Sequence, residues 1–232
     1  MLIALSSSFL FRYDIFGFYK NWKLSPILDI YKSLLEGLGP FAGALIITFI
    51  FKVKRKISFL GIAKLKSILM IITPILILFM FGIKNNTGFN KHVYGMLIGI
   101  WIVLYGIAEE TGWRGYLQDE LSNYKPIIKY SVVGVFWYVW HLTFLGNTNI
   151  LNEFFIFSIL VISSIGIGLI ADKTKSIFAA ACFHIIGNMI GFSTLFTTIF
   201  SLNKRLVIVG ICVVVWIAIM KIRIYTKKVN DY

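Results

Sequence analysis

Apolar residues in this chain gather into runs that are about as long as a membrane-spanning helix, and short polar segments separate these runs. The first apolar stretch, residues 1–19, is interrupted by Arg12 and Asp14, and we expect a short transmembrane or interfacial helix there. Seven further spans are predicted over residues 34–51, 65–83, 93–108 or beyond, 127–145, 154–171, 177–196 and 206–220. The pattern predicts an all-α, polytopic transmembrane bundle of about eight helices, forming a single integral-membrane domain over residues 1–232.

The composition agrees with a membrane location. Of the 232 residues, 58% are hydrophobic and only 14% are charged, whereas soluble domains carry about 25% charged residues. A chain this apolar is not intrinsically disordered, and two cysteines are too few for a disulfide scaffold. Both cysteines, Cys182 and Cys212, fall within predicted spans, where we expect them to pack as small apolar residues.

Basic residues outnumber acidic ones by 23 to 10. In a membrane protein this excess is typical of cytoplasmic loops, where Lys and Arg meet anionic lipid head groups. With eight spans and a cytoplasmic N-terminus, most basic residues fall on one side: near Lys54, after Glu109, at Lys173 and Lys175, and beyond Lys221. We therefore expect a multi-pass protein of the cell membrane with a cytoplasmic C-terminus, the lipid bilayer as its surroundings and no nucleic-acid partner.

A few ionisable side chains lie inside the predicted spans. Glu109 and Glu110 are adjacent, and Arg114 lies four residues after Glu110. Residues four apart share one face of a helix, so Glu110 and Arg114 can pair. Around the helix axis, Glu109 is rotated from Glu110 by about 100°, so the two carboxylates cannot have the same role. Buried ionisable groups in a membrane are functional candidates by default.

Two further segments show the same spacing. Trp137 and His141 are four residues apart, as are His184 and Asn188. Taken singly, such residues are often a salt bridge at the edge of a span, a carbonyl-bonded histidine or an amide that joins two helices. Taken together, they place polar groups in three separate spans, and one shared cavity would satisfy all of them. There a carboxylate and an imidazole can activate water, and a His–Asn pair can stabilise an oxyanion.

These residues resemble, in order and spacing, the CPBP family of intramembrane proteases. The three motifs are Glu109-Glu110-x-x-x-Arg114, Trp137-x-x-x-His141 and His184-x-x-x-Asn188. This family groups type II CAAX prenyl endopeptidases with bacterial proteins linked to bacteriocin processing and self-immunity (Abi proteins). The resemblance covers about residues 106–191, which form the expected catalytic motif core.

The resemblance implies a membrane-embedded, glutamate-dependent endopeptidase. It implies that Glu109 activates a water molecule, with His141 as its partner. His184 and Asn188 correspond to the residues that form the family's oxyanion hole. The implied substrate is a peptide or a membrane protein, whereas the cleavage position and the oligomeric state stay open.

The resemblance also assigns supporting positions. Glu110 and Arg114 correspond to residues that shape the site. The chain departs from the family pattern at Trp137, because phenylalanine is common at this position. The larger aromatic wall is expected to affect substrate fit more than chemistry.

Other functions stay open at this point. The cavity can belong to a non-catalytic immunity or scaffold protein that binds a peptide partner, or to a transporter with Glu109 or Glu110 as a proton relay. No cofactor is expected, but Glu109, His141 and His184 include the two histidines and one glutamate that zinc accepts. The sequence lacks the H-E-x-x-H and G-x-S-x-G motifs of zinc and serine proteases.

The depths of the motif residues disagree if every span is a straight helix. Counted from the cytoplasmic start of its predicted span, His141 lies about 21 Å deep, whereas Glu109 stays near the cytoplasmic side. Either the span of His141 begins outside the bilayer, or helices tilt or break near the site. Gly106, Gly112 and Gly115 can permit such a break. We expect a site nearer the cytoplasmic leaflet.

Overall fold

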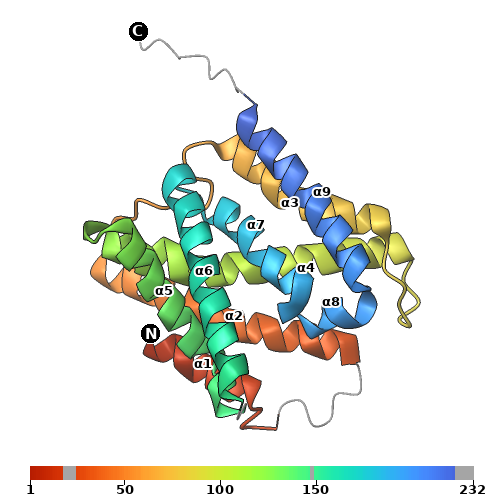
Figure 1. Ribbon diagram of the computed structural model, residues 1–232, viewed down its shortest axis with the longest axis horizontal. Coiled ribbons are helices and arrows are strands. Elements are labelled where there is room, and N and C mark those ends of the chain that lie inside the picture. Colours follow the sequence, from red (N-terminus) through yellow and green to blue (C-terminus); the bar gives the residue numbers. More distant parts are fainter. Residues whose placement is uncertain (18–24, 147–148, 223–232) are drawn as a thin grey trace.

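The computed structural model describes residues 1–17, 25–146 and 149–222, which form a bundle of helices. Nine α-helices occur in these ranges, so the predicted all-α bundle is confirmed. Two π-helical segments, Trp113–Gln118 and Asn188–Phe192, directly continue α4 and α7. The α-helices are α1 (Leu2–Arg12), α2 (Ser25–Phe51), α3 (Lys64–Phe81), α4 (Lys91–Gly112), α5 (Pro126–His141), α6 (Ile150–Thr174), α7 (Ile177–Gly187), α8 (Thr194–Ile199) and α9 (Leu202–Lys221) (Figure 1).

Five of these helices are long and apolar enough to cross a membrane. They are α2 from Lys32, α3, α4 with its π-helical continuation, α6 and α9. Helix α1 has 11 residues, which is about half the length that a straight span needs. Part of the predicted first segment, Phe18–Tyr19, lies outside the described residues.

The structure changes two of the predicted spans. The helix predicted over 127–145 ends at His141, because Leu142 adopts a left-handed conformation with φ of 52°. The helix predicted over 177–196 turns into a π-helix at Asn188, and Ser193 is extended before α8 begins. Hydropathy alone could not indicate either change, since the apolar pattern continues through both positions.

Helix α4 is the central element of the bundle (Figure 1). It packs against α2, α3 and α7, while α9 packs on α3 and α6 packs on α5. Buried apolar residues form two clusters, and α7 contributes to both. The last turn of α4 therefore lies in the interior, where several helices meet.

A glycine lets α4 approach α2 closely. A Cβ atom at Gly112 would lie 2.5 Å from Pro40 Cβ and 2.8 Å from the Pro40 carbonyl oxygen. Gly112 is also the last α-helical residue before the π-helix, so the chain changes geometry at one of the glycines where a break was expected. Because Pro40 lies within α2, any side chain at position 112 must push the two helices apart.

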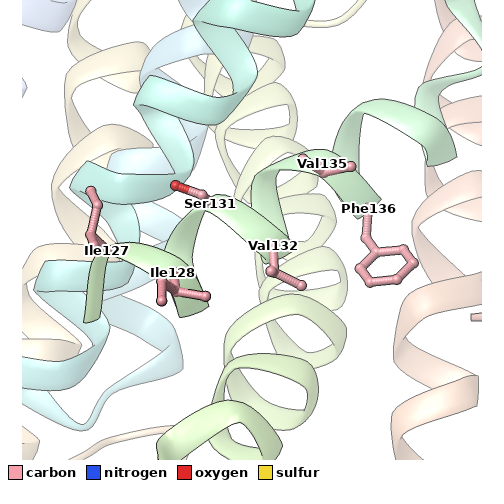
Figure 2. A pocket seen from close by; sticks show the side chains of 6 residues that line it. All are labelled: Ile127, Ile128, Ser131, Val132, Val135 and Phe136. Atoms are coloured by element: carbon pink, nitrogen blue, oxygen red, sulfur yellow. The ribbon is translucent and has the colours of Figure 1, made fainter. Parts of the chain in front are cut away.

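The outer side of α5 is apolar and exposed. Figure 2 shows these side chains along the helix, where they border a shallow, open hollow of about 520 Å³. In a membrane protein this surface is expected to contact lipid chains, while the opposite side of α5 faces the interior. The residues around the hollow are Ile127, Ile128, Ser131, Val132, Val135 and Phe136.

We predict that Gly112→Ala destabilises the protein by about 1–3 kcal/mol, since the added methyl group overpacks the contact with α2. Gly210→Ala is the matched control, because nothing lies within 4 Å of a Cβ at this helical position. The control should keep or raise the stability, as alanine favours helix more than glycine does. Denaturant unfolding in detergent micelles measures both variants. Equal stability of the two variants would contradict the role given to Gly112.

Candidate active site

The structure gathers the residues of the three sequence motifs where three helices change their geometry. Glu109 and Glu110 lie in the last turn of α4, just before the π-helix that carries Arg114. His141 is the last residue of α5, and Asn188 begins the π-helix that follows α7. A π-helical turn alters the direction of side chains relative to an α-helix, and such turns are common at functional sites.

A buried ion pair holds one side of the site. Arg114 Nη1 donates to Glu110 Oε1 over 2.8 Å, and both side chains are fully buried. The pairing predicted from their spacing is therefore confirmed. The same Glu110 oxygen accepts a hydrogen bond from His184 Nδ1 over 2.6 Å, and Arg114 Nη2 donates to Ser164 Oγ over 3.2 Å. The network joins α4 and its π-helical continuation to α6 and α7.

Glu109 has different partners, as the rotation between adjacent residues predicted. Its Oε2 atom accepts hydrogen bonds from the indole nitrogens of Trp137, over 2.9 Å, and Trp113, over 3.3 Å. Its Oε1 atom is buried without a hydrogen-bond partner and lies 3.8 Å from His184 Nε2. One oxygen of this carboxylate is thus fixed, and the other is left toward His184.

His141 is held by its own helix. Its Nδ1 atom lies 2.8 Å from the Trp137 carbonyl oxygen, one turn earlier in α5. A carbonyl oxygen only accepts hydrogen bonds, so Nδ1 carries the hydrogen and Nε2 has the free lone pair in the neutral ring. Glu109 and His141, both in the described part of the chain, make no direct hydrogen bond or ion pair. The structure instead places His184 next to both glutamates.

Both histidines and Asn188 border one cavity of about 560 Å³. Its wall is mainly apolar and comes from α6, α7 and the π-helix after α7, with Trp137 at one side. Asn188 Nδ2 is buried and has no hydrogen-bond partner. The cavity therefore combines an apolar wall with two imidazoles and an amide that has hydrogen-bonding capacity left.

A second, more polar cavity of about 340 Å³ also borders Asn188. Its lining includes Arg12 and Glu36, which form an ion pair of 2.6 Å between α1 and α2. Tyr105 also lines this cavity, and its ring meets the His184 imidazole edge-on with centroids 6.0 Å apart. Asn188 thus lies between a polar cavity and an apolar one.

The motifs did not indicate every residue that surrounds Glu109. Trp113 lies four residues after Glu109, so helical spacing could have identified it as a neighbour. Ser164, which bonds Arg114 across 50 positions in the chain, gave no local signal. Arg12 and Glu36 also lie outside the motifs. Contacts between distant segments depend on how the helices pack, and spacing within one helix does not contain this information.

Glu109, His141 and His184 are the residues that the sequence left open as zinc ligands. No group of three or more His, Cys, Asp or Glu side chains within residues 1–17, 25–146 and 149–222 is arranged to hold a metal ion. His184 Nδ1 is already bonded to Glu110, and Glu109 Oε2 is bonded to two indoles.

Comparison with known proteins finds a family that fits this arrangement. Residues 90–190 match the model of the Rce1-like family, described as type II CAAX prenyl endopeptidase Rce1-like. A relative from Methanococcus maripaludis, CAAX prenyl protease 2, is 34% identical over 100 residues. This alignment covers 38% of the present chain and 37% of the relative, so it spans little more than a third of either protein.

The matched segment contains all seven residues of the three motifs, from Glu109 to Asn188. The apolar helices and the family match together make the chain a multi-pass membrane protein. Over residues 90–190, which make up less than half of the chain, this protein is similar to the Rce1-like family of type II CAAX prenyl endopeptidases.

Proposed function

We propose that this protein is an intramembrane endopeptidase that hydrolyses a peptide bond with a water molecule activated by Glu109 and His141. The observation that carries the proposal is the oxygen without a hydrogen bond on the fully buried Glu109 carboxylate, which lies 3.8 Å from His184 Nε2, and His184 lines a cavity together with His141 and Asn188. The match of residues 90–190 adds support, because the matched family is one of endopeptidases. The catalytic roles given below are part of the proposal.

Water activation requires a base with a free lone pair. Glu109 Oε1 has no hydrogen-bond partner, and the hydrogen bond at His141 Nδ1 leaves the lone pair of the neutral ring on Nε2. In the proposed mechanism a water molecule lies between these two groups, and the carboxylate takes its proton as the oxygen attacks the peptide carbonyl. When the C–N bond then breaks, the protonated Glu109 gives this proton to the leaving amine. General-base catalysis of this kind contributes about 100- to 10,000-fold to a rate.

The attack creates a negatively charged oxygen that needs donors. Asn188 Nδ2 carries two hydrogens and has no partner within the protein. His184 Nδ1 donates to Glu110, and His184 can also donate from Nε2 when both ring nitrogens are protonated. Arg114 holds Glu110 in place through their buried ion pair. We therefore assign His184 and Asn188 to the oxyanion hole and Glu110 and Arg114 to its support.

The cavity suggests the kind of substrate. Its wall of Phe, Ile and Leu side chains from α6 and α7 fits an apolar segment of a peptide or membrane protein. The names of the family and of the matched relative mention CAAX prenyl substrates. Peptides with a prenylated C-terminal motif therefore belong in the first substrate panel, together with apolar leader peptides.

We predict that Glu109→Gln lowers kcat/KM by at least about 100-fold, since glutamine cannot take a proton from water. His141→Ala should cause a loss of similar size. Glu120→Gln is the matched control, because this glutamate pairs with Arg55 outside the site. Cleavage of fluorogenic peptides in lipid vesicles measures all variants after folding has been checked by size-exclusion chromatography. Full activity of folded Glu109→Gln rejects the glutamate mechanism, and a wild-type protein that binds but never cleaves the panel favours a scaffold.

We predict that catalysis does not depend on a metal ion. The reason is that no three His, Cys, Asp or Glu side chains in the described part of the chain are grouped to hold a metal ion, and the proposed water activation uses only Glu109 and His141. Peptide cleavage should persist after treatment with 1,10-phenanthroline, and elemental analysis of the purified active protein should find less than one metal ion per chain. Activity that chelation removes and zinc restores would contradict this prediction.

We also propose that the end of the bundle that carries the basic loops faces the cytoplasm. Arg55 contacts Glu120, Ile62 N donates to the Thr174 carbonyl oxygen, and Lys66 Nζ donates to the Met220 carbonyl oxygen. These contacts bring the loops after α2, after α4 and after α6 to the same end as the end of α9. Lysine and arginine are enriched in cytoplasmic loops, which supports this orientation.

A reporter fusion tests the orientation. Green fluorescent protein fused after residue 232 should fluoresce in a bacterial host, whereas alkaline phosphatase at the same position should stay inactive. As a control, the two reporters fused after Asn86, in the loop between α3 and α4, should give the opposite results, because α3 leads to the other end of the bundle. Active phosphatase at position 232 would reverse the proposed orientation.

A further inference from the structure

We propose that Trp137 is a positioning residue whose indole N–H group orients Glu109 for water activation. This inference rests on the proposed function, because it concerns the carboxylate that acts as the base. Trp137 Nε1 donates to Glu109 Oε2 over 2.9 Å, and the indole is buried with 5% of its surface exposed. A buried, charge-assisted hydrogen bond both fixes a carboxylate and stabilises its ionised form.

Trp137 contacts every motif of the site. Arg114 lies over its ring at 5.2 Å, and its ring centroid lies 5.0 Å from that of His184 and 5.6 Å from that of His141. Its backbone carbonyl also accepts the hydrogen bond that sets the His141 tautomer. The side chain therefore connects α5 to Glu109 on α4, to Arg114 on the following π-helix and to His184 on α7.

The two carboxylate oxygens of Glu109 have different hydrogen-bond partners. Trp137 and, at the longer distance of 3.3 Å, Trp113 both donate to Oε2, so this oxygen is fixed from α5 and from the π-helix after α4. Oε1 is the oxygen left without a hydrogen-bond partner. With Oε2 anchored, the carboxylate cannot rotate freely, and its lone pair on Oε1 keeps one direction.

The ring and the N–H group of Trp137 have separable roles. A phenylalanine at this position would supply an aromatic wall but no donor. Tryptophan gives this chain a hydrogen bond to its proposed base, which a phenylalanine cannot make. The substitution Trp137→Phe therefore removes the donor and keeps most of the wall.

Several charged or titratable groups act on Glu109 from the elements around it. Glu110 and Tyr105 lie on α4 itself, and His184 lies on α7. Arg114 acts from the π-helix after α4, and Arg12 acts from α1. All of them are retained in Trp137→Phe, so a change in the pH dependence of catalysis reports the lost indole donor.

The test compares Trp137→Phe with the wild-type protein in the vesicle cleavage assay. We expect kcat to fall about tenfold with KM within about twofold, because the lost contact orients the base and does not bind substrate. The acidic limb of the pH–rate profile should move to higher pH, since an ionised Glu109 loses a donor. Trp113→Phe should show the same changes to a smaller extent, in line with its longer hydrogen bond.

The matched control is Trp216→Phe. Trp216 is also fully buried and donates its indole N–H to a carbonyl oxygen, that of Met70, but it lies between α9 and α3. This variant should keep the wild-type kcat and pH profile. If Trp137→Phe fails to fold, 3-benzothienylalanine at position 137 preserves the shape of the side chain and lacks only the N–H donor.

The outcomes separate this inference from the proposed function. Wild-type kcat and an unchanged acidic limb in folded Trp137→Phe, with an inactive Glu109→Gln, overturn the positioning role and leave the mechanism standing. A raised KM with an unchanged pH profile overturns it as well, because tryptophan then acts only as a wall of the substrate site. Activity in Glu109→Gln overturns the proposed function itself, and this inference with it.

Discussion

The bonds between Arg114, Glu110 and His184 are the constraint on which the site depends. Arg114 and Glu110 are fully buried, and taking such charges out of water costs several kcal/mol per ion. Their mutual attraction offsets this cost only while both remain paired, so neither group can move independently. Because His184 bonds the same carboxylate oxygen, the network fixes α7 against α4, and Ser164 extends it to α6.

This constraint separates two neighbouring carboxylates that differ by a single position in the chain. Glu110 is bonded to Arg114 and to His184, whereas Glu109 keeps one oxygen without a hydrogen bond beside the same imidazole. Indole donors fix the other oxygen of Glu109, so its environment is polar but contains no lysine or arginine hydrogen bond. A carboxylate held in this way keeps one oxygen available for a water molecule, whereas the Glu110 oxygen that Arg114 and His184 bond is occupied.

The sequence indicated the parts of this arrangement that depend on local helical geometry. The pairing of Glu110 with Arg114 and the separate surroundings of Glu109 followed from helical rotation alone. The bond between Glu110 and His184 did not, because it joins residues 74 positions apart on helices whose packing no local pattern specifies. The end of α5 at His141 was also missed, since the left-handed Leu142 lies inside an apolar run.

The motif residues whose depths disagreed in straight spans lie where helices end or change geometry. His141 ends α5, Glu109 lies in the last turn of α4, and Asn188 starts the π-helix after α7. Helix α5 has only 16 residues, fewer than the roughly 20 that a straight span requires. Irregular backbone within a membrane is tolerated where it is buried in protein or lines a cavity. The helices thus change geometry where the site needs its polar side chains, and the surrounding bundle keeps this region away from lipid.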